Sequence, residues 1–290
     1  MLSMTGYGRG RASQAGRELL LELKTVNHRF LDVSLRLPRP ITFLEEPLRT
    51  RISEGSLQRG HVDVSVTYAN LRPDAQSVTI DGALLAQCSQ AADAVALQLD
   101  RETPDLASLL TLCGALHVTQ AEEDAEAVTA LMQTACDEAL AQLQAMRQRE
   151  GEALARDMQA NLRQCEALTA EVEQRAPAVP EAYRQRLEAR LAEWAVQAAD
   201  PQRVAQEVAL MADRCAIDEE LARLRSHYAQ FAQCLRDPGE VGRRMDFLLQ
   251  EMNREANTIG SKASDAHIAQ RVVELKCLLE KLREQAQNVV

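Results

Sequence analysis

Hydrophobic and polar residues alternate along the first 80 residues of the chain. Leucine or valine takes every second position within residues 19–23, 31–35 and 62–66. A period of two is typical of strands with one buried face, so we expect these segments to form an antiparallel sheet. Residues 4–11 can add a further strand, and residues 43–54 a short helix. The expected order is β-β-β-α-β.

Beyond residue 80 the pattern favours helices. Asp81 is expected to cap a helix that reaches Asp100, and Thr103-Pro104-Asp105 to begin another with the proline near its first turn. From Asp124 to Glu173 the chain has no proline and one glycine, Gly151, while apolar residues recur at helical spacing. This stretch predicts one long helix or a hairpin of helices.

Two regular apolar seams mark the C-terminal part of the chain. Apolar residues step by four and three from Ile217 to Leu235 and again from Ile268 to Val289, which is the repeat of a coiled coil. The seams can pair within one chain or between subunits. A helix from Val241 to about Ile259 is expected between them. Gly260-Ser261-Lys262 is then expected to form a turn, with Ser264 as the cap of the final helix.

These patterns predict an α+β fold. An N-terminal mixed domain with an antiparallel sheet is followed by a long-helical middle and a helical C-terminal domain. We place the domains at residues 1–123, 124–202 and 203–290. Prolines mark joints within and after the middle part, at Pro177 and Pro180, before a helix through Trp194, and at Asp200-Pro201.

The net charge of −10 argues against a protein that coats nucleic acid through bulk attraction. The charge is uneven, however. Residues 1–72 carry eleven Lys and Arg against seven Asp and Glu, residues 73–202 nine against twenty-two, and residues 203–290 thirteen against fourteen. A polyanion site is therefore expected at the two ends of the chain.

Signals for export and for common catalytic sites are missing. No apolar run approaches a membrane span, and the opening MLSMTGYGRG lacks the apolar block of a secretory signal, so we expect a cytoplasmic protein without a membrane partner. The seven scattered cysteines form no C-x-x-C pair and are expected to stay reduced. The phosphate loop, the G-x-S-x-G elbow and the H-E-x-x-H helix are absent, which argues against the commonest hydrolase and nucleotide-binding classes.

Glycine takes every second position from Gly6 to Gly10. On a strand this leaves one face bare, while the other face offers a ring and two guanidinium groups from Tyr7, Arg9 and Arg11. Such a face suits stacked bases and phosphates. A tightly packed edge strand with Tyr7 in the core explains the same pattern.

Basic side chains gather in the sequence near expected strand ends and near the last helices. They could contact the phosphates of a polyanion, or they could simply be solvated. The candidates are Arg9, Arg29, Arg36, Arg39, Arg59 and His61 in the first domain, and Arg243, Arg244, Arg254 and Lys262 in the last.

Residues 246–262 carry two polar stripes beside an apolar one. At about 100° per residue, Asp246 joins Gln250, Asn253 and Asn257 in one stripe. Glu251 and Glu255, four residues apart, belong to another, and their like charges repel unless a cation or a cationic partner intervenes.

A divalent cation held by Glu251, Glu255 and Asp246, with His227 from the preceding helix, can stabilise charge in phosphodiester hydrolysis. His227, Glu251 and Glu255 are therefore the catalytic candidates. The alternatives are that the two Glu pair across helices with Arg243, Arg244 or Arg254, and that His227 is solvated.

Long blocks of the sequence resemble the YicC/YloC family. They include LQEMNREANTIGSKA and DRCAIDEELARLRSHYAQF near the C-terminus, and MLSMTGYGRG, LKTVNHRFLDVSLRLP and RGHVDVSV near the N-terminus. The resemblance implies a bacterial endoribonuclease that prefers single-stranded RNA and uses a divalent cation, Mn²⁺ or Mg²⁺. It also implies a homo-oligomer, a hexamer, and on that basis we expect at least one apolar seam to be buried between subunits.

Two other functions compete with RNA hydrolysis. An oligomeric adaptor that delivers RNA to another nuclease needs the same arginines but no carboxylate cluster. A purely structural helical assembly explains neither the second polar stripe nor the uneven charge.

Overall fold

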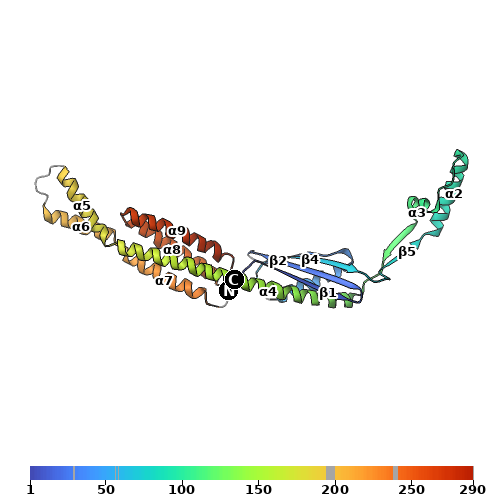
Figure 1. Cartoon of the computed structure of the whole chain (residues 1–290), viewed down its shortest axis with the longest axis horizontal. Coiled ribbons are helices and arrows are strands. Elements are labelled where there is room, and N and C mark those ends of the chain that lie inside the picture. Colours follow the sequence, from blue (N-terminus) through green and yellow to red (C-terminus); the bar gives the residue numbers. More distant parts are fainter. Residues whose placement is uncertain (29, 56, 58, 194–199, 238–240, 290) are drawn as a thin grey trace.

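A four-stranded sheet forms the N-terminal part of the chain, and its strands lie beside the long helix (Figure 1). The computed structural model describes residues 1–28, 30–55, 57, 59–193, 200–237 and 241–289. The sheet order is β1 (Gly6–Gln14), β2 (Arg17–Val26), β4 (Gly60–Asn70) and β3 (Leu31–Arg36), and the short helices η1 (Arg39–Leu44) and α1 (Glu45–Glu54) connect β3 to β4. The predicted β-β-β-α-β order and the α+β class are confirmed.

The sheet is only in part antiparallel. β1 pairs with β2 and β2 with β4 in antiparallel fashion, but β3 runs parallel to β4. The crossover through α1 explains this, because it returns the chain to the end of the sheet at which β3 began. The expectation that β3 is antiparallel is therefore wrong.

The glycines of β1 allow a long helix to lie directly on the sheet. A Cβ atom on Gly8 would stand 2.0 Å from the main-chain oxygen of Ala139, and one on Gly10 would stand 1.8 Å from that of Ala135. β1 is thus a tightly packed edge strand. Tyr7 is not in the core, however: it points outward, 43% exposed, and its hydroxyl donates to Glu22.

Helix α4 (Ala125–Arg175) links the two halves of the molecule. It is a single helix of 51 residues, roughly 75 Å long, and not a hairpin. Its first half covers the sheet, with Val128 to Leu143 in the same core as the strands, and its second half joins a helical bundle through residues such as Leu162. The acidic middle of the chain therefore contributes to both cores.

The bundle is completed by α7 (Asp218–Cys234), α8 (Gly242–Lys262) and α9 (Ala266–Ala286). Both apolar seams are buried inside one chain, from Ile217 to Phe231 on one helix and from Ile268 to Val289 on the other. The expectation that a seam is buried between subunits is wrong, because α4 and α8 already cover both.

The end of α8 also differs from the prediction. Gly260, Ser261 and Lys262 form its last turn, and Asp265, not Ser264, caps α9 by accepting from the main-chain N–H groups of His267 and Ile268.

The two termini meet where the sheet ends and the bundle begins (Figure 1). Ser3 bridges to Val289, and the buried Arg147 of α4 donates through Nε to the main-chain oxygen of Ser3 at 2.6 Å. Gly151 lies beneath this crossing, since a Cβ there would stand 2.7 Å from the main-chain oxygen of Met1. Close approach of the N-terminal segment explains the glycine in the middle of the long helix.

Two projections extend beyond the cores (Figure 1). At one end lies the arm, residues 76–120, in which β5 (Gln76–Ile80) and β6 (Leu116–Gln120) form a ribbon that carries α2 (Gly82–Leu99) and α3 (Leu106–Cys113). Asp81 caps α2, as predicted. Asp105 caps α3, so Pro104 lies just before the helix and not in its first turn. The strands β5 and β6 were not predicted.

At the other end of the molecule lie α5 (Ala178–Glu193) and α6 (Pro201–Arg214), with Asp200 as the cap of α6. Trp194, expected within the helix after Pro180, falls outside the described residues. None of the helices in the described ranges is long and apolar enough to cross a membrane.

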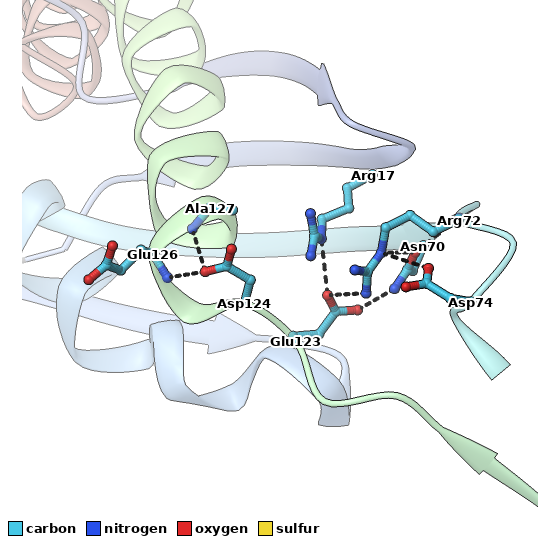
Figure 2. A network of polar contacts seen from close by, with 8 residues as sticks. All are labelled: Arg17, Asn70, Arg72, Asp74, Glu123, Asp124, Glu126 and Ala127. Atoms are coloured by element: carbon cyan, nitrogen blue, oxygen red, sulfur yellow. Dashed lines mark hydrogen bonds and ion pairs between the residues drawn. The ribbon is translucent and has the colours of Figure 1, made fainter. Parts of the chain in front are cut away.

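A buried carboxylate fixes the arm to the sheet and to α4 (Figure 2). Glu123 accepts from Nε of Arg17 at 3.1 Å and from the side-chain amide of Asn70 at 2.8 Å, and Arg72 lies 3.6 Å away. The next residue, Asp124, caps α4. Burial alone would raise the pKa of Glu123, but its polar neighbours, Arg17 among them, outweigh burial and hold the pKa below the ordinary value.

Candidate active site

Helices α7 and α8 run antiparallel and are tied together by polar contacts along one edge. Lys262 donates to the carboxylate of Glu220 at 2.7 Å and to the main-chain oxygen of Ala216 at 3.2 Å. Farther along, Nη1 of Arg223 lies 3.5 Å from Oε1 of Glu255. These contacts fix which residues of the two helices stand opposite each other.

The same register places His227 level with Glu251. Ala216 stands opposite Lys262, and Arg223 stands opposite Glu255. Moving seven residues toward the C-terminus of α7 therefore corresponds to moving seven residues toward the N-terminus of α8. His227 is one turn beyond Arg223, and Glu251 is one turn before Glu255. Because residues four apart share a helix face, His227 and Glu251 belong to the same edge. We call this edge the α7–α8 polar seam: Glu220, Arg223, His227, Glu251, Glu255 and Lys262.

Several atoms of the seam have unused bonding capacity. Oε2 of Glu220 and Nδ1 of His227 are buried, and neither has a hydrogen-bond partner among the described residues. The carboxylate of Glu251, half-buried, makes no ion pair or hydrogen bond with that part of the chain. Buried polar atoms without partners are costly, so a water molecule or a ligand is expected beside them.

Two acids of the seam, Glu220 and Glu255, are buried. The side chains of Glu220 and Glu255 are each 6% exposed. Burial alone would raise the pKa of Glu220, but the Lys262 ammonium group outweighs burial and holds the pKa below its usual value. Glu220 is therefore ionised at neutral pH, with Lys262 as its partner, and Arg223 is shared between Glu255 and Glu219.

The expected cation ligands are brought together in part. Glu251 and Glu255 share the seam with His227, but Asp246 lies on the other side of α8, near Arg283 of α9. Helix geometry explains this, because nine residues at about 100° each place Asp246 opposite Glu255. Glu255 pairs with Arg223 and with none of the three arginines considered from the sequence. Within the described ranges, no three His, Cys, Asp or Glu side chains are grouped so as to hold a metal ion.

Comparisons with known proteins cover almost the whole chain. The family description "Endoribonuclease YicC-like, N-terminal region" matches residues 1–156, and "Endoribonuclease YicC-like, C-terminal" matches residues 172–290. The chain belongs to the YicC-like endoribonuclease family. The YicC-like C-terminal region contains the whole α7–α8 polar seam.

Two relatives of the YicC-like family are similar over their full length. "Probable endoribonuclease YicC" of Clostridioides difficile (strain 630) is 35% identical over 291 residues, with 99% of each chain covered. The protein of the same name from Haemophilus influenzae (strain Rd) is 35% identical over 287 residues, again with 99% of each chain covered.

The basic residues of the YicC-like N-terminal region do not form one rim. Arg59 and His61 stand at the start of β4, beside the start of β3. Arg36 is at the end of β3, where it pairs with Ser65 of β4, and Arg39 begins η1 just after that strand. The parallel pairing of β3 and β4 separates these groups, by about 13 Å between His61 and Arg36 at 3.3 Å per residue. Arg9 is exposed on the outer face of β1, and Arg29 lies outside the described residues.

A small polar cluster occupies the sheet edge that faces the bundle. Nδ1 of His61 lies 2.8 Å from Oδ2 of Asp32, and the ring of His28 stands edge-on to it at 6.4 Å between centroids. Arg59 donates to the main-chain oxygen of His28, and Asn27 donates to that of Gln287, which follows α9. The hydrogen bond from Asn27, just after β2, to Gln287, just after α9, joins the sheet to the bundle at this point.

The C-terminal basic residues lie on and beside the outer face of α8. Arg243 and Arg254 are exposed, and neither makes an ion pair with the described residues. Arg244 lies 3.5 Å from Asp237, and Lys262 belongs to the polar seam. The sequence reasoning missed Phe247, which is 60% exposed on the same face. Helical spacing alone places Phe247 outside the apolar stripe of α8, so its exposure could have been predicted from the sequence.

Proposed function

We propose that this chain is a cytoplasmic endoribonuclease that cleaves single-stranded RNA with a divalent cation, Mn²⁺ or Mg²⁺, in RNA turnover or small-RNA regulation. The observation that carries the proposal is the α7–α8 polar seam, where the register places His227 of α7 level with Glu251 of α8, one turn from Glu255. Relatives named as probable endoribonucleases support the reaction class.

The donor types of the seam suit a hard divalent cation, although the described side chains are not grouped so as to hold one without rearrangement. Carboxylate oxygens are the ligands that Mg²⁺ and Mn²⁺ prefer, and imidazole is a further ligand for Mn²⁺. Oε2 of Glu220 and Nδ1 of His227 have no hydrogen-bond partner among the described residues, which supports the presence of a ligand at the seam. Glu251 and Glu255 would hold the ion, with His227 beside them. A bound ion would supply charge stabilisation and an activated water for phosphodiester hydrolysis.

The other residues of the seam can position RNA and move protons. The partnerless Nδ1 of His227 can accept or hold a proton at the reacting edge. The Arg223 side chain is half exposed, so its guanidinium can turn from Glu255 toward a phosphate. Arg243 and Arg254 on the outer face of α8 have no acidic partner among the described residues and can contact neighbouring phosphates.

Cleavage is expected to require the cation. Purified protein with labelled single-stranded RNA should show internal cleavage with Mn²⁺ or Mg²⁺ and none with a chelator, because carboxylates alone cannot stabilise the charge that develops on phosphorus. The measurement is gel separation of the products, and readdition of the ion should restore activity. Cleavage that persists in the chelator would contradict the part assigned to the cation.

A non-catalytic RNA adaptor is favoured by one observation. Glu220 and Glu255 are already paired with Lys262 and Arg223, so the seam can exist without a cation. In that case charge-removing variants of Glu251 and Glu255 would leave cellular RNA levels unchanged. A nuclease would lose its effect on those levels.

We also propose a homo-oligomer, a hexamer, in which the arm contacts another subunit. The strands of the arm carry no Asp, Glu, Lys or Arg, although charged side chains normally guard free strand edges. Large apolar side chains of the arm are exposed, including Leu97 at 87% and Leu112 at 81%. A two-stranded ribbon is marginally stable by itself, and an apolar surface of this kind marks a contact site.

Light scattering is expected to give the mass of a hexamer for the unmodified chain. Leu97→Asp with Leu112→Asp should lower that mass, because two charges would be buried in the contact. Leu210→Asp, at an exposed apolar position of α6, is the matched control and should not change the mass. A monomeric mass for the unmodified chain would contradict the oligomer.

A further inference from the structure

The outer face of α8 carries an uncommon set of side chains. Arg243, Phe247, Gln250, Arg254 and Asn257 follow one another at steps of four and three, and all five are exposed. At about 100° per residue they share one narrow stripe along the helix. Phe247 thus lies in open solvent between two arginines that have no acidic partner within the described part of the chain.

A groove runs beside this stripe, between α8 and α9. Its volume is about 440 Å³. Buried Leu249 and Leu279 contribute its apolar surface, and Asn253 and Asn257 line it with amide groups. Arg254 adds positive charge, whereas Arg283 is paired with Glu280, which also lines the groove. Gln250, Asn253 and Asn257 of the second polar stripe therefore line a groove, whereas Asp246 of the same stripe does not.

The amide groups of the groove are available to a ligand. The side chains of Gln250, Asn253 and Asn257 make no hydrogen bond to any described residue. An amide can donate and accept side by side, which matches the paired acceptor and donor at the N7 and N6 edge of adenine. Proteins that read single-stranded RNA combine such contacts with stacking of bases on aromatic rings.

The position of the groove relative to the polar seam suits an RNA strand. Measured around α8 from Arg243, Glu251 and Glu255 lie at about 80° and 120° on one side, and Asn253 lies at about 80° on the other. A strand crossing the outer face would have its backbone beside the acids and a base beside the amides. Arg243 and Arg254 have no acidic partner among the described residues, which favours a polyanion as the occupant of this face.

We propose that Phe247 and the α8–α9 groove form a base-recognition subsite for single-stranded RNA. One base stacks on the ring of Phe247, and an adjacent adenine enters the groove and pairs with the amides of Asn253 and Asn257. Arg243 and Arg254, which stand on either side of Phe247 along the helix, contact phosphates that flank the stacked base. The proposal rests on the proposed function only in taking RNA as the ligand.

Binding measured in a chelator tests the subsite apart from cleavage. The probes are a short labelled uridine oligomer and the same oligomer with one central adenosine. The unmodified chain should bind the adenosine-containing probe more tightly. Phe247→Ala should weaken binding of both probes by about five- to a hundred-fold, since one stacked base is lost. Asn253→Ala with Asn257→Ala should remove the difference between the probes and leave the salt dependence of binding unchanged.

Matched controls come from exposed positions of α9. Val273→Ala removes an exposed apolar side chain, and Gln270→Ala removes an exposed amide. Both should bind like the unmodified chain.

Equal binding of the two probes by the unmodified chain, or variants that behave like these controls, would overturn the subsite while leaving the nuclease proposal intact. Absence of RNA binding by the unmodified chain would overturn both. A changed mass in light scattering with unchanged RNA affinity would assign this face to a subunit contact and overturn the subsite.

Discussion

Replacing Glu251 and Glu255 together by Gln is expected to remove most RNA cleavage and to leave RNA binding intact or stronger. Gln keeps the size and one acceptor oxygen of Glu but carries no charge, so the pair can no longer hold a divalent cation. The expected loss of cleavage rate is on the order of a hundred-fold or more, as for other electrostatic groups of active sites. Binding should not weaken, because two charges that repel phosphates are gone.

The fold should survive these substitutions. Glu251 has no ion pair to lose among the described residues, and the partner of Glu255, Arg223, is half exposed and can be solvated. Glu284→Gln is the matched control, since it removes an exposed carboxylate from α9 of the same bundle. Cleavage rates should be measured beside circular dichroism and light scattering. Full activity in the double variant would contradict the assignment and move the search to Glu219, Glu220, His28 and His61.

The sequence predicted those parts of the fold that depend on local periodicity. In α7 and α9 the heptad steps predicted a helix with one buried face, and in β1 to β4 the alternation predicted a strand. The structure confirms these elements. β5 and β6 were missed because they are short, are exposed along their whole length and pair across 35 intervening residues. The parallel pairing of β3 was missed because strand direction depends on the crossover and not on the pattern of either strand.

The candidate site could be predicted only as far as one helix determines it. Helical spacing placed Glu251 beside Glu255, and the same arithmetic sets Asp246 apart from them. The partner of Glu255 could not be predicted, because Arg223 reaches it only through the register of α7 against α8. The burial of Glu220 depends on the same packing.

Replacing Glu123 by Gln is expected to destabilise the junction of arm, sheet and α4 by about 3 kcal/mol, the usual cost of leaving a buried charge without its partner. Arg17 and Glu123 are each 7% exposed, so water can replace little of the lost interaction. Hydrogen exchange in β2, β4 and the first turns of α4 should become faster. Local exchange is the suitable measurement because a chain with two cores need not unfold in one step. Glu122→Gln, which removes the neighbouring exposed carboxylate, should leave exchange unchanged.

The pH dependence of this loss identifies its cause. The pKa of Glu123 is lowered in the folded chain from its ordinary value of 4.5, so its charge stabilises the fold fully above that value. The contribution disappears as the pH falls through the lowered pKa, where Glu123 becomes protonated and resembles Gln. The difference in hydrogen exchange between the unmodified chain and Glu123→Gln should therefore be largest near neutral pH and shrink in acid. A difference that persists undiminished in acid would mean that hydrogen-bond geometry, and not the charge of Glu123, holds the junction together.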